Sequence, residues 1–349
     1  MTAELAGIGS AVPDGGADQD ELWDGFFSEH FADNRIARRL FESAGVRRRH
    51  VVANPLHEDV SAWSTAERMN RYAEVAPDLG ARAVAAALDD AAIPPEEAGM
   101  FAVATCTGYA TPGVDIRVAA DLGMRTDVQR LVIGHMGCYA AVPALGVAAD
   151  FVVARNRPAI VLCLELTSLH LQPPTADTEQ IVSHALFGDA AVAVVLRPAT
   201  SQCRGPALVD VAARTDSDTT GHMTWDITDT GFRMGLSPKV PEVLGEHLAA
   251  VVDELLARNG LHRRDVHGWA VHPGGPRILD TAENVLGLGP SDLARSREVL
   301  AEHGNCSSAT LPLIVERMVR GGETGTGHLI ALAFGPGLTL YAALLRARP

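Results

Sequence analysis

The succession of apolar and polar positions predicts helices that alternate with buried strands. Residues 86–103 (AALDDAAIPPEEAGMFAV) fit the end of an amphipathic helix, a short polar turn and a buried strand. Residues 253–271 (DELLARNGLHRRDVHGWAV) show the same succession. Strands that alternate with helices indicate an α/β fold.

The two stretches belong to an internal repeat with an offset of 168 residues, which pairs Leu88 with Leu256 and Phe101 with Trp269. The same offset pairs GHMGCYAAVPAL, from Gly134, with EHGNCSSATLPL, from Glu302, and AIVLCLEL with GHLIALAF. We therefore expect two homologous halves, residues 1–200 and residues 201–349. The segments that differ, around residues 170–235, are expected to form cavity walls and connections.

A single cysteine, Cys138, stands where an apolar run gives way to a small-residue helix pattern. A buried packing cysteine is the commoner meaning of such a position. The repeat instead favours a functional role for Cys138. Asn305 lies one position from the counterpart of Cys138, and both are expected where a buried strand gives way to a helix. His272 follows the second copy's strand, so a pseudo-two-fold axis between the halves would bring the three side chains together.

Cysteine, histidine and asparagine in this arrangement suit acyl transfer through a thioester. A helix start and a neighbouring imidazolium both favour the thiolate of Cys138, which would attack a thioester carbonyl. Asn305 is not a base, but its amide N–H can donate to a developing oxyanion. With His272 it could hold a malonyl thioester while CO2 leaves, and the enolate would attack the acyl group on Cys138.

Composition excludes several other classes of function. The net charge of −14 argues against a general nucleic-acid binder. No apolar run reaches the roughly 18 residues of a membrane span, and MTAELAGIGS lacks a signal-peptide pattern. The five cysteines lack the spacing of a disulfide framework and fit reduced thiols. The sequence contains neither a CxxC nor an HExxH motif, so no metal site is indicated. We expect a cytoplasmic protein without a membrane or nucleic-acid partner.

One local cluster departs from the acidic average. Residues 35–49 (RIARRLFESAGVRRR) contain six arginines and one acid, Glu42. Two interpretations stay open at this point, a solvated helix face and a binding site for a phosphorylated small ligand.

Four blocks, GCYAAVPAL, HPGGPRILD, HGNCSSATLP and FGPGLTLYAALL, resemble the signatures of type III polyketide synthases, the chalcone-synthase-like enzymes. The resemblance runs from about Leu5 to the C-terminus. It implies a thiolase-type αβαβα layered fold, a homodimer, and the catalytic triad Cys138, His272 and Asn305. It also implies acyl-CoA and malonyl-CoA as substrates, without a further cofactor.

The resemblance assigns further positions one by one. Those that it implies for the cavity and for CoA binding are Phe187 and Phe232 at the junction of CoA tunnel and active site, Thr167, Ser307 and Cys106 in the cavity wall, Gly335, Pro336 and Gly337 in a cavity-shaping loop, and Arg39 among the basic CoA contacts. The chain departs from the plant enzymes at Cys106 and His170, where these have threonine. His170 is expected to narrow or polarise its side of the cavity.

The expected function is condensation of an acyl-CoA starter with several malonyl-CoA units, followed by cyclisation to a pyrone, resorcinol or naphthol. One alternative is a single-step β-ketoacyl-CoA synthase of the same fold. Another is a non-condensing acyl-binding protein, against which the intact triad argues. Whether the starter comes from CoA or from an acyl carrier protein stays open.

Overall fold

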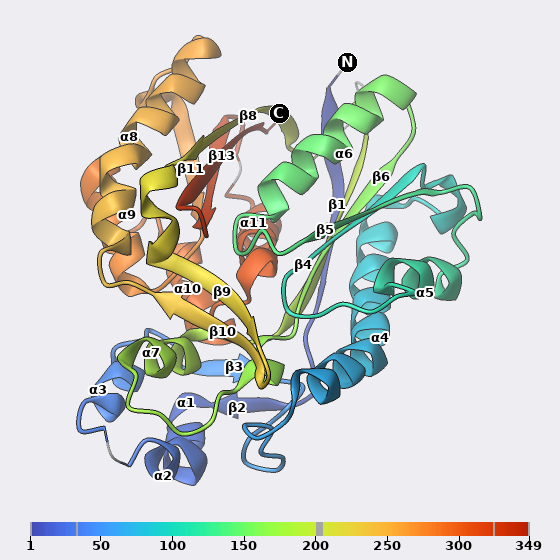
Figure 1. The fold of residues 1–349 in the computed structure, drawn as a ribbon. Helices are drawn as coiled ribbons and strands as arrows, with labels where there is room; N and C mark the ends of the chain where they lie inside the picture. Colours follow the sequence, from blue (N-terminus) through green and yellow to red (C-terminus); the bar gives the residue numbers. More distant parts are fainter. Residues whose placement is uncertain (1, 33, 200–204, 324, 348–349) are drawn as a thin grey trace.

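A mixed sheet runs through the middle of the fold (Figure 1). The structure is a computed structural model that describes residues 2–32, 34–199, 205–323 and 325–347. Within these residues the nine strands of the sheet follow in spatial order: β11 (Val266–Val271), β12 (His328–Gly335), β13 (Thr339–Arg346), β8 (Ala207–Thr215), β1 (Ala3–Ala11), β7 (Ala190–Pro198), β6 (Ala159–Glu165), β4 (Met100–Thr105) and β5 (Gln129–Gly134). Helices cover both faces, as expected for an α/β fold.

The larger helices form three layers around the sheet. They are α4 (Thr65–Ala91), α5 (Val114–Asp121), α6 (Ala141–Arg155), α7 (Thr178–Leu186), α8 (Val240–Arg258), α9 (Pro276–Leu286), α10 (Ala294–His303) and α11 (Thr310–Arg320). Helices α6 and α11 pack in one apolar core that includes strands from both halves. Helix α4 covers the outer face on one side and α8 with α9 covers it on the other (Figure 1).

The smaller elements lie at one end of the sheet, near α7 (Figure 1). They are β2 (Gly16–Asp18), α1 (Gln19–Leu22), α2 (Ser28–His30), α3 (Ala37–Glu42), β3 (Arg48–His50), β9 (Met223–Thr228) and β10 (Gly231–Leu236). Strands β9 and β10 form an antiparallel hairpin that reaches from the α8 side toward this end.

The layered α/β fold built from two similar halves is confirmed by the pairing of the strands. Strand β6 pairs parallel with β4 and antiparallel with β7, and β12 pairs parallel with β11 and antiparallel with β13. The helix–turn–strand units that the periodicity predicts are α4 with β4 and α8 with β11. A 168-residue repeat in the sequence therefore appears as a repeated strand order in space.

Three details of the sequence prediction are wrong. Residues 170–235 are not only cavity walls, because they contain β7 and β8, two strands of the central sheet. The strand before Cys138, β5, is an exposed edge rather than a buried strand. The segment before Asn305 is the helix α10, so no strand at this position of the second half corresponds to β5.

Close packing of α4 on β1 explains why β1 carries glycines. A Cβ atom at Gly9 would lie 2.3 Å from the backbone nitrogen of Ala87, and one at Gly7 would lie 2.3 Å from its carbonyl oxygen. Real structures do not hold such contacts, so only glycine lets α4 approach this closely. Helix α4 begins at a capping box, in which the Ser64 hydroxyl accepts from the Glu67 N–H at 3.3 Å.

Among the described residues, no helix combines the length and the apolar character that crossing a membrane requires.

Candidate active site

Cys138, His272 and Asn305 line the same cavity, which we call the outer cleft and which has a volume of about 640 Å3. All three are buried, with exposed fractions of 6%, 0% and 2%. Residues 40–44, 177–187, 234–241 and 274–278 contribute to its walls. The structure therefore brings together three side chains that lie up to 167 positions apart in the sequence.

Cys138 is positioned by a tight turn between β5 and α6. Gly137 has a φ of +80°, and a Cβ atom there would lie 2.7 Å from the Cδ of Pro336. The turn therefore needs a residue without a side chain, both for its left-handed backbone and for the approach of the 335–337 loop. Helix α6 begins three residues after Cys138, at Ala141, so the thiol lies near the positive end of a helix.

Asn305 is fixed at both its backbone and its side chain. Its N–H donates to Leu186 O at 2.8 Å, and its carbonyl accepts from Gly188 N–H at 3.1 Å. Its Oδ1 accepts from the N–H of Ser307 at 2.8 Å. A backbone N–H can only donate, so the atom facing it must be oxygen and the amide NH2 is left to donate elsewhere. Asn305 is thus held as a hydrogen-bond donor at the site.

His272 follows β11 directly, and its N–H donates to Leu332 O at 2.8 Å. Its ring lies edge-on to Phe334, with 5.6 Å between the ring centroids. Neither ring nitrogen has a hydrogen-bond partner among the described residues, although both are buried. Buried polar atoms are rarely left unpaired, so these nitrogens are free to bond a group that enters the cleft.

Burial keeps both the thiol and the imidazole neutral when each is considered alone. It raises the pKa of Cys138 to about 12, against the lowering effect of side-chain hydrogen bonds from Ser307 and Asn305. It lowers the pKa of His272 to about 3. Neither group would ionise by exchange with water at neutral pH. A proton passing from Cys138 to His272 creates two charges that stabilise each other, which burial opposes far less.

Cys138 also lines a smaller cavity of about 20 Å3, which we call the inner chamber. Four positions singled out from the sequence line it together with Cys138: Cys106, Thr167, Phe187 and Ser307. Pro336 of the 335–337 loop lines it as well. Thr167 donates to the Gly188 carbonyl at 2.8 Å, so its hydroxyl is engaged with the backbone.

Cys106 belongs to a buried hydrogen-bond network around Glu165. Its N–H donates to Glu165 at 3.0 Å, and its sulfur lies 3.2 Å from Ser307 Oγ. Burial raises the pKa of Glu165 and raises that of Cys106 well above its ordinary value, and the Glu165 charge adds to the rise at Cys106. Cys106 is therefore held as a thiol, not as a thiolate nucleophile.

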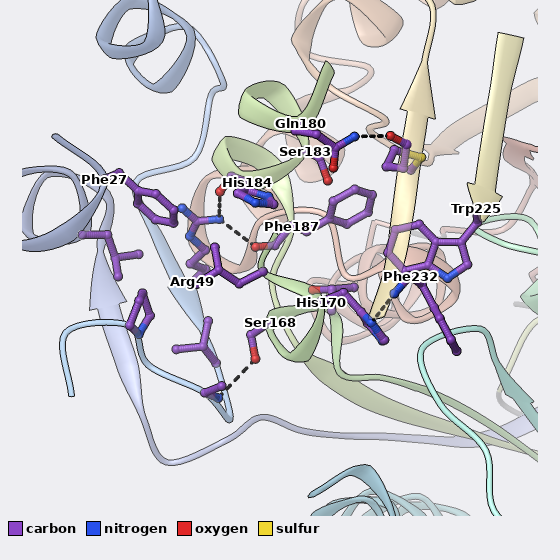
Figure 2. A pocket seen from close by; sticks show the side chains of 17 residues that line it. Phe27, Arg49, Ser168, His170, Gln180, Ser183, His184, Phe187, Trp225 and Phe232 are labelled. Carbon is purple, nitrogen blue, oxygen red and sulfur yellow. Dashed lines mark hydrogen bonds between the residues drawn. The ribbon is translucent and has the colours of Figure 1, made fainter. Parts of the chain in front are cut away.

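Phe187, Phe232 and His170 meet at a third cavity of about 50 Å3, the side cavity (Figure 2). His170 stacks on Phe232 with 4.4 Å between centroids. Its Nε2 donates to Thr107 O and its Nδ1 accepts from the Phe232 N–H. Both ring nitrogens bind the backbone, and burial lowers the pKa of His170 to about 3. His170 therefore narrows the side cavity without adding a charge to it. Phe232 lines neither the outer cleft nor the inner chamber.

The 335–337 loop packs directly on the Cys138 turn. A Cβ at Gly335 would lie 3.0 Å from the Tyr139 ring and 3.4 Å from Cys138 N. Gly337 has a φ of +133°, which favours glycine.

The arginine cluster does not form one surface. Arg38 pairs with Asp20, Asp24 and Glu42, and Arg49 is buried. Arg39 is exposed on α3 and does not line the outer cleft, whereas Leu40, Ser43 and Ala44 of the same segment do.

Sequence reasoning missed several residues of the site. Glu165 left a signal, as the one charged residue in the apolar strand AIVLCLEL. Arg277, which lines the outer cleft, follows the HPGGP block directly. Trp225 and Met234 left no signal in the sequence, because only the tertiary fold brings the β9–β10 hairpin to the site.

Two family models match the chain: "Chalcone and stilbene synthases, N-terminal domain" over residues 1–199, and the corresponding C-terminal domain over residues 209–349. The chain is 32% identical to an alpha-pyrone synthesis polyketide synthase-like protein, Pks18, of Mycobacterium tuberculosis, over 88% of this chain and 81% of that protein. It is 33% identical to the 1,3,6,8-tetrahydroxynaphthalene synthase of Streptomyces peucetius, over 95% of this chain and 88% of that protein. The crystal structure of PKS-I from the brown alga Ectocarpus siliculosus superimposes with a TM-score of 0.93 at 27% identity, covering 99% of this chain and 98% of that one.

The neutral pair predicts how Cys138 reacts with iodoacetamide. In the wild type, proton transfer to His272 supplies thiolate at neutral pH, so the alkylation rate should change little between pH 7 and pH 9. In His272→Gln the proton must leave to solvent, and the rate should rise about tenfold per pH unit over the same range. Mass spectrometry of the Cys138 peptide measures both rates. His303→Gln, which alters a histidine outside the three cavities, is the control. Equal profiles for wild type and His272→Gln would show that His272 does not accept the proton.

Proposed function

The chain belongs to the family of chalcone and stilbene synthases, and on this premise we propose that it is a type III polyketide synthase. It condenses an acyl-CoA starter with several malonyl-CoA units and cyclises the poly-β-keto chain to a pyrone, resorcinol or naphthol. The observation that carries the proposal is that Cys138, His272 and Asn305 line one buried cavity. The N-terminal half, residues 1–200, supplies the nucleophile, and residues 201–349 supply His272 and Asn305.

Loading begins with proton transfer from Cys138 to His272. The thiolate attacks the thioester carbonyl of the starter, and CoA leaves as a thiolate that takes the proton from His272. The acyl group is then held on Cys138. This step needs only the nucleophile Cys138 and its base His272.

Extension uses the same two donors on a different carbonyl. His272 and the Asn305 NH2 hold the thioester oxygen of malonyl-CoA, CO2 leaves, and the electron pair of the broken bond forms an enolate stabilised by both donors. The enolate carbon attacks the acyl carbonyl on Cys138 and releases the thiolate. Because neutral His272 carries one proton, it can act as donor in this step and as base in loading.

The inner chamber supports a role for its lining in product choice. Cys106, Thr167, Ser307 and Pro336 stand beside Cys138, where a growing chain would fold back. Phe187 lines both this chamber and the outer cleft, through which we propose that CoA thioesters enter. The thioesters are the substrates, and the proposed chemistry calls for no further cofactor. Four described cysteines are free, which supports a cytoplasmic location.

The function is tested by mass spectrometry of products formed from malonyl-CoA alone and from malonyl-CoA with short, medium and long acyl-CoAs. We expect products of two or more extensions with at least one of these mixtures. A pentaketide naphthol from malonyl-CoA alone would indicate naphthol synthesis, and products only with fatty acyl-CoAs would indicate pyrone or resorcinol synthesis. A single extension with every starter would favour the one-step β-ketoacyl-CoA synthase. Acyl transfer that requires a carrier protein would appear as loading from acyl carrier protein but not from CoA.

Two variants should separate loading from decarboxylation. Cys138→Ala removes the nucleophile and should abolish acyl loading and products, while decarboxylation of malonyl-CoA continues, because His272 and Asn305 remain. Asn305→Ala keeps the nucleophile and should retain loading, but lower the rate of CO2 release about 100-fold or more, as expected for loss of an oxyanion donor. Intact-protein mass and CO2 release measure the two steps. Product formation by Cys138→Ala, or unchanged CO2 release by Asn305→Ala, would contradict the assigned roles.

We propose that a second copy of the chain covers the free edge of the sheet. Strand β5 ends the sheet, and Leu131 and Val132 in it are 37% and 50% exposed. An exposed apolar edge strand is rare unless a partner covers it. Light scattering should give twice the chain mass for the wild type and a lower mass for Val132→Glu. Ile227→Glu, at an exposed position on β9, is the control and should stay dimeric. A monomeric wild-type protein would contradict the proposal.

A further inference from the structure

The side cavity contains a buried cation that the proposed reaction does not use. Arg49 follows the exposed arginines of the cluster, but its side chain turns inward from β3 and is only 4% exposed. Figure 2 shows it on one side of the side cavity, with Trp225 and Phe232 of the β9–β10 hairpin on the other and Phe187 between them.

The guanidinium is only partly bonded. Its Nη1 donates to the carbonyl oxygens of His184 and of Phe187, the latter at 2.8 Å. Its Nε and Nη2 have no hydrogen-bond partner among the described residues, and no described carboxylate forms an ion pair with it. Burial lowers the pKa of Arg49 only to about 10, so it stays protonated at neutral pH. A buried charge with unbonded N–H groups is costly, so the site favours an acceptor with negative charge.

The surrounding groups add donors and no free acid. Nε2 of His184 accepts from the Gln172 N–H at 3.0 Å, which places its proton on Nδ1. Ser183 contributes a hydroxyl to the same lining. The acid whose charge acts on Arg49 is Asp189, and its carboxylate already accepts from the N–H groups of Val52 and Ser168. The cavity therefore offers donors and a positive charge to whatever enters it.

The side cavity adjoins the place where an acyl chain would sit. Phe187, Thr167, Trp225 and Met234 line both the side cavity and the inner chamber that contains Cys138. The inner chamber measures only about 20 Å3, little more than the about 10–15 Å3 that one water molecule needs. An acyl chain on Cys138 that extends through the inner chamber therefore also needs the about 50 Å3 of the adjoining side cavity.

We propose that Arg49 binds the carboxylate at the far end of an acyl group carried on Cys138. The preferred starter is thus an ω-carboxyacyl thioester, the monothioester of a dicarboxylic acid. The proposal rests on the proposed function, because it needs Cys138 to carry the starter. It adds a specificity residue, since Arg49 acts on the end of the chain that does not react. A carboxylate accepts two parallel N–H bonds, which matches the free Nε and Nη2 of one guanidinium.

The test compares pairs of CoA thioesters of equal chain length, one with a terminal carboxylate and one without. The pairs are succinyl-CoA with butyryl-CoA, glutaryl-CoA with valeryl-CoA, and adipyl-CoA with hexanoyl-CoA. Intact-protein mass spectrometry gives the rate of Cys138 acylation for each. At one chain length at least, the wild type should load the carboxylated member at least tenfold faster. In Arg49→Met this ratio should fall to one or below, because the guanidinium is gone while the volume is similar.

Two further variants keep the result specific. Ser183→Leu fills the side cavity and leaves Arg49 in place, so it should also lose the preference, even if Arg49→Met fails to fold. Arg155→Met, at the exposed end of α6, changes the net charge equally and should keep the wild-type ratio. Loading by the uncharged thioesters should persist in Arg155→Met.

The outcomes separate the two proposals. Equal loading of both members of every pair by the wild type would overturn the role of Arg49, as would an unchanged ratio in Arg49→Met. In both cases loading itself would still support the polyketide synthase. Absence of loading by any thioester, from CoA and from acyl carrier protein alike, would instead overturn the proposed function, and the role of Arg49 with it.

Discussion

The backbone of Asn305 is held between Leu186 and Gly188, and the arrangement of the whole site depends on this tie. It joins the segment after α10, in the second half, to the end of α7, in the first half, through two hydrogen bonds of 2.8 and 3.1 Å. Gly304 permits it, because a Cβ there would lie 2.5 Å from the Leu186 carbonyl oxygen. Asn305 and Phe187 are thereby bridged, so donor and cavity wall keep a fixed relation.

Burial of ionisable groups is the second constraint. Cys138, His272, Cys106 and Glu165 all lie in surroundings that oppose their charged forms. In such a site a charge forms only where another group stabilises it at once, which restricts ionisation to proton transfer within a pair or to an oxyanion beside a donor. The same burial that keeps the resting site neutral strengthens the electrostatic interactions that form during the reaction.

Phe187 lines cavities of different chemistry. In the outer cleft, His272 and Asn305 are the proposed donors to a thioester carbonyl. In the side cavity, the guanidinium of Arg49 is only partly hydrogen-bonded. The backbone carbonyl of Phe187 accepts a hydrogen bond from Arg49, and Phe187 lines all three cavities. One residue thus connects the position of the reacting carbon with that of the chain end.

The sequence by itself determined the α/β class, the repeated helix–turn–strand units and the three residues that meet at the outer cleft. These follow from periodicities over about 20 residues and from a repeat, both of which are local properties of the chain. Only the tertiary structure decided that β5 is an exposed edge, that a helix precedes Asn305, and that Arg49 is buried although its neighbours Arg47 and Arg48 are exposed. Those outcomes depend on which distant segment packs against each residue, and one sequence does not encode that contact locally.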